Sequence, residues 1–178
     1  MTRHKKYVVT AMCITLCAVL PLTLHFIPRA GSTVMPMHIP VLLCGLIVGP
    51  YFGFLAGLLG PLLSSFTTGM PLMAYVPVMM IELAAYGLFC GIFAKIFRAR
   101  SLRNGYLNLY AAMIPAMLIG RILGGMARIF LYAPALYNET LLIWWLSSYF
   151  VTSLPGIIIQ LALIPAIVVA LEKSRVLE

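Results

Sequence analysis

Two ionisable side chains lie in the middle of long apolar runs. Glu82 lies inside the run 73–97 and Arg121 inside the run 106–131, each about ten residues from the same predicted end of its helix. At a rise of about 1.5 Å per residue, the two side chains share one depth in a bilayer. An ionised group inside a membrane is costly and normally faces a partner or a wet cavity. We therefore expect Glu82 and Arg121 to form a contact between neighbouring helices.

This pair has two open interpretations, because a buried pair either packs helices or binds a polar ligand. Helical spacing places Tyr75 on the same helix face as Glu82. The same spacing places Arg128 and the glycines 124–125 on the face of Arg121, where missing side chains leave space beside a cation. If the pair binds a ligand, Tyr75 and Arg128 are expected to line the same site.

Other polar side chains extend this candidate site. Trp145, Ser148 and Tyr149 form a mixed face that can stack on a ring and donate hydrogen bonds, or serve as a belt at the membrane surface. His38 opens an apolar run and is either a ligand contact or a structural residue. Gln160, deep in the last run, joins helices or forms a pocket floor. We expect a substrate site that contains Trp145, Ser148, Tyr149 and His38 together with Glu82 and Arg121, whereas the role of Gln160 stays open.

Catalytic and metal-binding patterns are missing from the sequence. It contains no H-E-x-x-H, G-x-S-x-G or P-loop pattern and no aspartate. The 4 cysteines lie inside apolar runs without C-x-x-C spacing, and the 3 histidines show no ligand spacing. We expect no enzymatic activity, no metal and no cofactor, so energy for uphill transport has to come from a partner or an ion gradient.

The composition indicates that lipid surrounds these apolar runs. Apolar residues make up 63% of the 178 residues and charged residues 9%, with a mean hydropathy of +1.06. A water-soluble fold of this length cannot bury so much apolar surface. The prediction is an all-α integral membrane protein with one transmembrane domain, residues 1–178, built as a six-helix transmembrane bundle. The expected helices cover about 7–27, 38–49, 52–66, 73–97, 106–131 and 141–171.

Two of these runs, 38–49 and 52–66, are shorter than the roughly 17 residues that normally cross a membrane. They form two short or partly broken helices or a re-entrant hairpin, and both choices add an even number of passes. No internal repeat is visible, which makes a self-sufficient secondary transporter less favoured.

Basic residues indicate the orientation of the bundle. They cluster beside the membrane-spanning runs at 3–6, 95–103 and 173–175. Six passes place all three clusters on one side, which the positive-inside rule identifies as the cytoplasm. We expect both termini to be cytoplasmic. The same placement excludes a nucleic-acid-binding surface, because the charges flank membrane segments.

The first helix carries a stripe of small side chains, Ala11, Thr15 and Ala18. Small residues at this spacing let another helix approach closely. The stripe serves packing within the bundle or contact with a partner protein, and the sequence alone leaves both open.

Several short stretches resemble one transporter family. They are the segments 37–45 (MHIPVLLCG), 49–53 (GPYFG), 61–65 (PLLSS) and 82–87 (ELAAYG), together with Gly120-Arg121. They are similar to stretches of the S components of energy-coupling factor (ECF) transporters. An S component is the substrate-binding membrane subunit of such a transporter in the bacterial cell membrane. The resemblance implies a protein that binds a micronutrient with high affinity on its outer side. It also implies a membrane scaffold subunit driven by two ABC ATPases, with toppling of the S component to release substrate inward.

The resemblance also implies roles for particular residues. In the family, an A-x-x-x-A stripe on the first helix meets the scaffold, and here the matching place is Ala11-x-x-x-Thr15. Family pockets use the outer halves of helices four to six. Onto that region fall Tyr75, Glu82, Arg121, Trp145, Ser148 and Tyr149.

Two other functions fit the composition: a structural membrane protein of cell-envelope assembly, and an independent ion-coupled carrier. The substrate also stays open. Arg121 favours a carboxylate or another electron-rich group, and the aromatic residues suit a ring. Pantothenate, niacin, pyridoxine-like compounds, flavin-like compounds and modified-base precursors all stay open.

Overall fold

A computed structural model of the chain describes residues 1–23, 33–99, 105–132, 147 and 151–174. Over these residues the protein has six α-helices and no strand, which confirms the predicted all-α class. The elements are α1 (Arg3–Thr23), α3 (His38–Ile47), α4 (Pro50–Thr68), the 3-10 helix η1 (Met73–Tyr75), α5 (Val76–Ala99), α6 (Gly105–Tyr132) and α8 (Leu154–Lys173).

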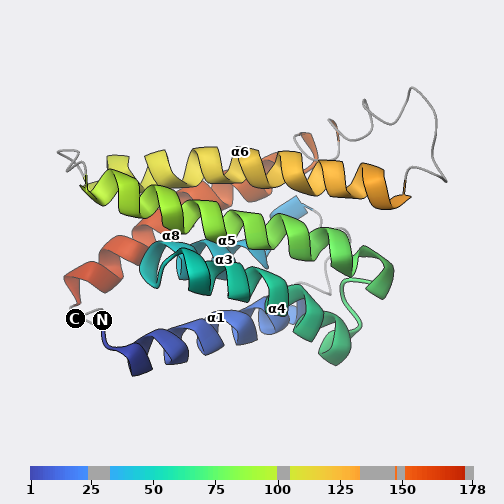
Figure 1. The fold of residues 1–178 in the computed structure, drawn as a ribbon, viewed down its shortest axis with the longest axis horizontal. Coiled ribbons are helices and arrows are strands. Elements are labelled where there is room, and N and C mark those ends of the chain that lie inside the picture. Colours follow the sequence, from blue (N-terminus) through green and yellow to red (C-terminus); the bar gives the residue numbers. More distant parts are fainter. Residues whose placement is uncertain (24–32, 100–104, 133–146, 148–150, 175–178) are drawn as a thin grey trace.

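The helices lie side by side along one long axis (Figure 1). The N-terminus, the end of α5, the start of α6 and the end of α8 all lie at one end of the bundle, here called the basic end. Arg3, Lys5, Lys95 and Lys173 are exposed there. The opposite end, here called the η1 end, holds η1 and the end of α6.

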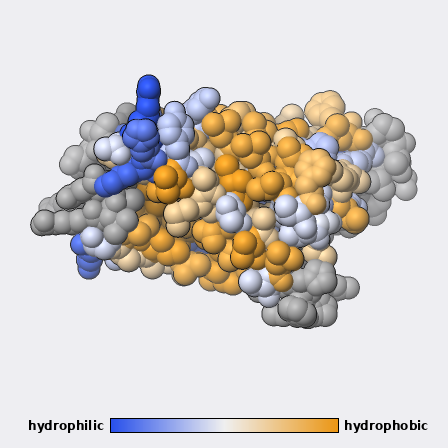
Figure 2. All heavy atoms as spheres, turned by 90° about the horizontal axis from the view of Figure 1, so that it is seen from below, coloured by the Kyte–Doolittle hydropathy of each residue, from blue (hydrophilic) through white to orange (hydrophobic). Residues whose placement is uncertain are grey.

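The sides of the bundle are apolar, as expected of a surface in contact with lipid. Figure 2 shows a broad hydrophobic face with strongly hydrophilic residues gathered at the basic end. Five of the described helices are long and apolar enough to cross a membrane, whereas α3 has only 10 residues. The chain is therefore a multi-pass membrane protein.

The segment 38–66 forms one short and one full-length helix. The predicted run 52–66 is part of α4, whose 19 residues begin at Pro50 and end at Thr68. Pro50 suits the first helical turn because its missing N–H group has no partner to lose there. Gly49 turns the chain with φ 121°, and Gly69 ends α4 in the left-handed conformation. Only α3 remains too short to cross a membrane.

The described part of the apolar run 141–171 contains α8 (Leu154–Lys173). Among the described residues, α8 begins at Leu154 with Ser153 as its N-cap residue. Pro155 lies in the first turn of α8, where a proline is tolerated, and it disfavours a continuous helix through the preceding residues. The Thr152 N–H group donates to the Ser147 carbonyl at 2.9 Å, a five-residue turn just before α8. Residues 141–146 and 148–150 lie outside the described residues.

Glycines bring the backbones of α3, α4 and α5 into contact. A Cβ atom on Gly45 or on Gly53 would lie only 2.5 Å from the carbonyl oxygen of Gly87. A Cβ atom on Gly87 would clash directly with the Gly53 backbone. No larger residue fits between helices at this distance. This packing fixes α3 against α5, and thus sets His38 on α3 relative to Glu82 on α5.

Candidate ligand-binding site

A buried polar cluster, here called the central cluster, lies in the interior of the bundle. Its described members are His38, Glu82, Tyr86, Arg121, Ser153, Gln160 and Met35. The Glu82 side chain of α5 is buried, with its residue 5% exposed, and its Oε1 atom lies 3.6 Å from Nε2 of His38 on α3. The Tyr86 hydroxyl, one turn along α5, donates to the same Oε1 atom at 3.4 Å. The rings of His38 and Tyr86 pack edge to face with centroids 5.0 Å apart. Glu82 therefore joins two helices through one carboxylate oxygen.

Arg121 of α6 is the second charged member of the cluster and is only 1% exposed. Its Nη1 atom donates to Ser153 Oγ at 2.7 Å, and its Nη2 atom lies 3.6 Å from Met35 Sδ. Ser153 is the N-cap residue of α8, and Met35 precedes α3. A single guanidinium therefore ties α6 to α8 and to the segment that leads into α3.

Glu82 and Arg121 lie at similar depth, on neighbouring helices. A Cβ atom on Gly124 would lie 2.9 Å from Glu82 Oε2, and one on Gly120 would lie 3.0 Å from the Tyr86 ring. Arg121 lies between these two glycines on α6, so its backbone is level with the segment 82–86 of α5. A direct contact between the Glu82 and Arg121 side chains stays a prediction.

Gln160 completes the cluster from α8 and is fully buried. Its Nε2 atom donates to the Met35 carbonyl at 3.5 Å, and the same carbonyl accepts the His38 backbone N–H group at 3.1 Å. Met35 itself has a φ of 50°, which is rare for a residue with a side chain. The Met35 backbone is thus held in an uncommon conformation between Arg121, His38 and Gln160.

Side-chain atoms of His38 and Gln160 have unused hydrogen-bonding capacity within the described residues. They are Nδ1 and Nε2 of His38 and Oε1 of Gln160, all buried. Buried polar atoms in folded proteins almost always have a partner, and exceptions concentrate at functional sites. A polar ligand that reaches this cluster can supply these missing hydrogen bonds.

The start of α3 adds a further electrostatic feature. With 10 residues, α3 begins at His38 beside Glu82, in the bundle interior rather than at a surface. The N-terminus of a helix carries a partial positive charge, and interrupted membrane helices commonly direct such ends at a substrate. The positive charge of Arg121 and the partial positive charge at the start of α3 together equal or exceed the single negative charge of Glu82. The cluster suits a ligand with an anionic or electron-rich group.

Sequence reasoning placed eight residues in a substrate site, and the structure separates them. Glu82, Arg121 and His38 belong to the central cluster. Tyr75 and Arg128 instead contact each other at the η1 end, with the Arg128 guanidinium 5.4 Å from the centre of the Tyr75 ring. Trp145, Ser148 and Tyr149 lie outside the described residues.

Two members of the cluster were not predicted from the sequence, namely Ser153 and Met35. Ser153 stands just before Leu154-Pro155, and a serine ahead of a helix that starts near a proline is a typical N-cap signal. That signal marks a helix start but does not indicate a contact with Arg121. Nothing in the sequence singles out Met35, because its role comes from its backbone carbonyl and its sulfur atom.

The stripe on α1 is divided by the packing of that helix. Ala11 and Thr15 are exposed, whereas Ala18 is buried within the chain at 8% exposure. The Thr15 hydroxyl donates to the Ala11 carbonyl at 3.0 Å. The part of the stripe that is open to another protein is therefore Ala11 and Thr15.

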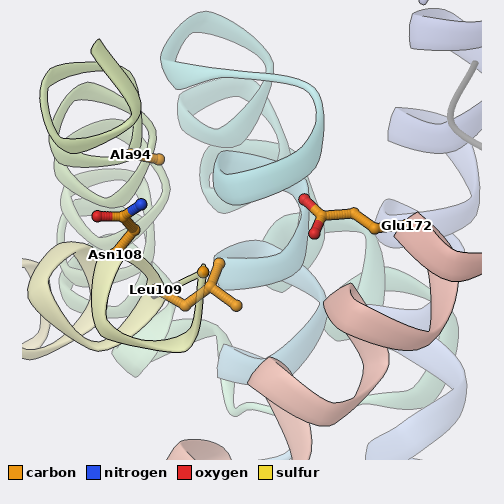
Figure 3. Close-up of a pocket in the computed structure, with 5 residues that line it drawn as sticks. Ala94, Asn108, Leu109 and Glu172 are labelled. Carbon is orange, nitrogen blue, oxygen red and sulfur yellow. The ribbon is translucent and has the colours of Figure 1, made fainter. Parts of the chain in front are cut away.

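A separate cavity of about 190 Å³ lies at the basic end, lined by Ala94, Gly105, Asn108, Leu109 and Glu172. Figure 3 shows that it lies between the α5–α6 pair and the end of α8. Ala94 is twelve residues beyond Glu82 on α5, or about 18 Å along the helix. This cavity is not part of the central cluster.

Comparison with known proteins points to one family. A family model described as "ECF transporter, substrate-specific component" matches residues 5–168. No curated protein and no solved structure match the chain. The matched range includes every described member of the central cluster and the exposed stripe on α1.

Proposed function

The chain belongs to the substrate-specific components of ECF transporters, and on that basis we propose that it captures a B-vitamin-like micronutrient at the central cluster. His38, Glu82 and Arg121 contact the substrate, which is then delivered inward with the help of ATPase partners. In this role the chain binds and translocates but does not catalyse a reaction.

The observation that carries this proposal is the unused hydrogen-bonding capacity of buried groups. His38 has two ring nitrogens without a hydrogen bond in the described structure, and Gln160 has one such oxygen. A purely architectural cluster would satisfy these atoms within the bundle, because each unpaired buried group costs about 1–3 kcal/mol. A ligand that bonds to them recovers part of that cost as binding energy.

The chemistry of the cluster favours a substrate with an electron-rich group, a ring, or both. Arg121 presents a planar set of donors that matches a carboxylate or a carbonyl. Tyr86 and His38 offer ring edges and faces beside it. Pantothenate, niacin, pyridoxine-like and flavin-like compounds and modified-base precursors all remain candidates.

The proposed orientation places the basic end in the cytoplasm. The exposed Arg3, Lys5, Lys95 and Lys173 at that end support it, because cytoplasmic loops retain Lys and Arg. Substrate then enters from outside through the η1 end, where Tyr75 and Arg128 lie. Both termini are cytoplasmic in this arrangement, in the bacterial cell membrane.

The partners in this proposal are a membrane scaffold subunit and two ABC ATPases. The exposed stripe of Ala11 and Thr15 on α1 is the contact with the scaffold. Two small residues one turn apart allow a second helix to approach closely, and the internal hydrogen bond of Thr15 removes the cost of covering its hydroxyl.

A thermal-shift screen of the purified protein against the water-soluble vitamins and modified-base precursors tests the function. We expect one compound to raise the melting temperature, and uptake of that compound into proteoliposomes to require the scaffold and ATPases. Uptake without them would favour an ion-coupled carrier. A stable protein with no response to any compound would favour a structural role in the envelope.

A further inference from the structure

Gln160 has a feature that helix packing alone does not explain. The residue is fully buried in α8, and its two amide ends differ in environment. Nε2 donates to the Met35 carbonyl at 3.5 Å, whereas Oε1 has no hydrogen bond among the described residues. The orientation of the amide is fixed, because only its nitrogen can donate to a carbonyl oxygen. The end that remains available is therefore an acceptor.

Gln160 lies beside the donor-rich side chain of the cluster. Met35 separates the two residues, with its sulfur atom facing Arg121 and its carbonyl facing Gln160. Ser153, which accepts from Arg121, is seven residues before Gln160 and thus lies on the same face of α8. The guanidinium and the Gln160 amide therefore contact the same residue, Met35, the first through its sulfur atom and the second through its carbonyl oxygen.

The Arg121 guanidinium and the Gln160 amide oxygen require opposite hydrogen-bonding partners. An arginine side chain has only donors, so it selects an acceptor or an anion. The Gln160 oxygen is only an acceptor, so it selects an N–H or O–H group. A simple carboxylate with no adjacent donor satisfies Arg121 but leaves Gln160 Oε1 unpaired in a low-dielectric interior, which carries a penalty.

We propose that the substrate presents an N–H donor next to its acceptor group, as a lactam, ureide or carboxamide edge does, and that Gln160 reads this donor. The proposal rests on the proposed function, because it assigns the same central cluster to the substrate. Gln160 is then a specificity-determining residue, and Arg121 holds the acceptor atom beside it.

Three pairs of probes differ in whether they carry an N–H donor. Riboflavin has an N–H group between two carbonyls that 3-methylriboflavin lacks. Biotin carries a ureide at the end of an acid chain, whereas lipoate carries a dithiolane. Nicotinamide has a donor where nicotinate has a second oxygen. Titration of the wild-type protein with all six compounds is expected to give tighter binding of the N–H member, by at least about tenfold, in the pair that binds.

Three variants connect this preference to Gln160. Gln160→Met has a similar length but no acceptor, and we expect it to abolish the preference within the pair. Gln160→Glu keeps an acceptor and is expected to retain the preference. Ile164→Met is the control, because Ile164 is buried one turn further along α8 and has no polar atom.

The outcomes separate this inference from the function on which it rests. Equal binding of the two members of a pair, or tighter binding of the member without the donor, overturns the inference and leaves the function intact. A preference that survives in Gln160→Met overturns the role of Gln160. A wild-type protein that binds none of the six compounds and none of the vitamin panel contradicts the proposed site, and the inference with it. If Gln160→Met does not fold, Gln160→Glu and the wild-type pairs still decide.

Discussion

The Nε2 atom of His38 lies 3.6 Å from the Oε1 atom of Glu82, and this contact joins the first residue of α3 to the second turn of α5. The distance is too long for a good hydrogen bond but short enough for strong electrostatic coupling in a medium of low dielectric constant. The charge of Glu82 therefore acts on the His38 ring, whose two nitrogens both lack a hydrogen bond in the described structure.

Replacing Glu82 with glutamine distinguishes a ligand site from an architectural pair. Glutamine keeps the size of the side chain and the acceptor for Tyr86, but it removes the negative charge beside His38. We expect Glu82→Gln to change the melting temperature of the ligand-free protein by only a few degrees and to weaken ligand binding at least about tenfold. Thermal melting and titration calorimetry on the same sample measure both. A variant that melts at a much lower temperature but binds the ligand with wild-type affinity would make the pair architectural.

Close packing of α4 against α5 makes a stability prediction. A methyl group on Gly87 would clash with the Gly53 backbone, which cannot move away as a flexible side chain does. We expect Gly87→Ala to lower the free energy of unfolding by about 1–3 kcal/mol or more. Gly105→Ala is the control, since a Cβ atom there meets nothing within 4 Å. Unfolding in detergent, followed by circular dichroism, compares the two, and equal stability would show that the helices do not meet as closely as described.

Orientation in the membrane is tested by labelling single cysteines. Lys95 is exposed at the basic end and Met73 at the η1 end. With a membrane-impermeant maleimide on intact cells, we expect Met73→Cys to react and Lys95→Cys to react only after the membrane is opened. The 4 native cysteines are buried, so their background labelling is expected to be low. The reverse pattern would place the termini outside.

Large side chains on the exposed stripe of α1 are expected to block assembly of the protein with the scaffold subunit. Ala11→Trp and Thr15→Trp enlarge two side chains that face away from the bundle, so we expect them to fold normally but to co-purify poorly with the scaffold and ATPases. Phe130→Trp is the control, as Phe130 is 78% exposed on α6. Undiminished recovery of the complex with both α1 variants would exclude this stripe as the contact.

Much of this structure follows from local sequence signals. Apolar length and breakers located the helices because a membrane span needs a minimum run of apolar residues. Glu82 and Arg121 stood out in the sequence because a charged side chain inside a membrane has a high free-energy cost. Helical spacing placed Arg121 and Arg128 on one face, but it does not indicate which neighbours a side chain contacts at each depth.

Other features depend on contacts that no local pattern encodes. The partner of Arg121 on α8 is Ser153, which is 32 residues away, and the Met35 carbonyl that Gln160 contacts is 125 residues away. Tertiary packing, rather than propensity, decides these points.

Equilibrium titration of Arg121→Ala with the compound found in the vitamin screen tests the central site most directly. Arg128→Ala serves as the matched control, because Arg128 is on the same helix but stacks on Tyr75 at the η1 end. We predict that Arg121→Ala loses affinity at least about a hundredfold while Arg128→Ala loses far less. Wild-type affinity in a folded Arg121→Ala protein would contradict a substrate site at this cluster.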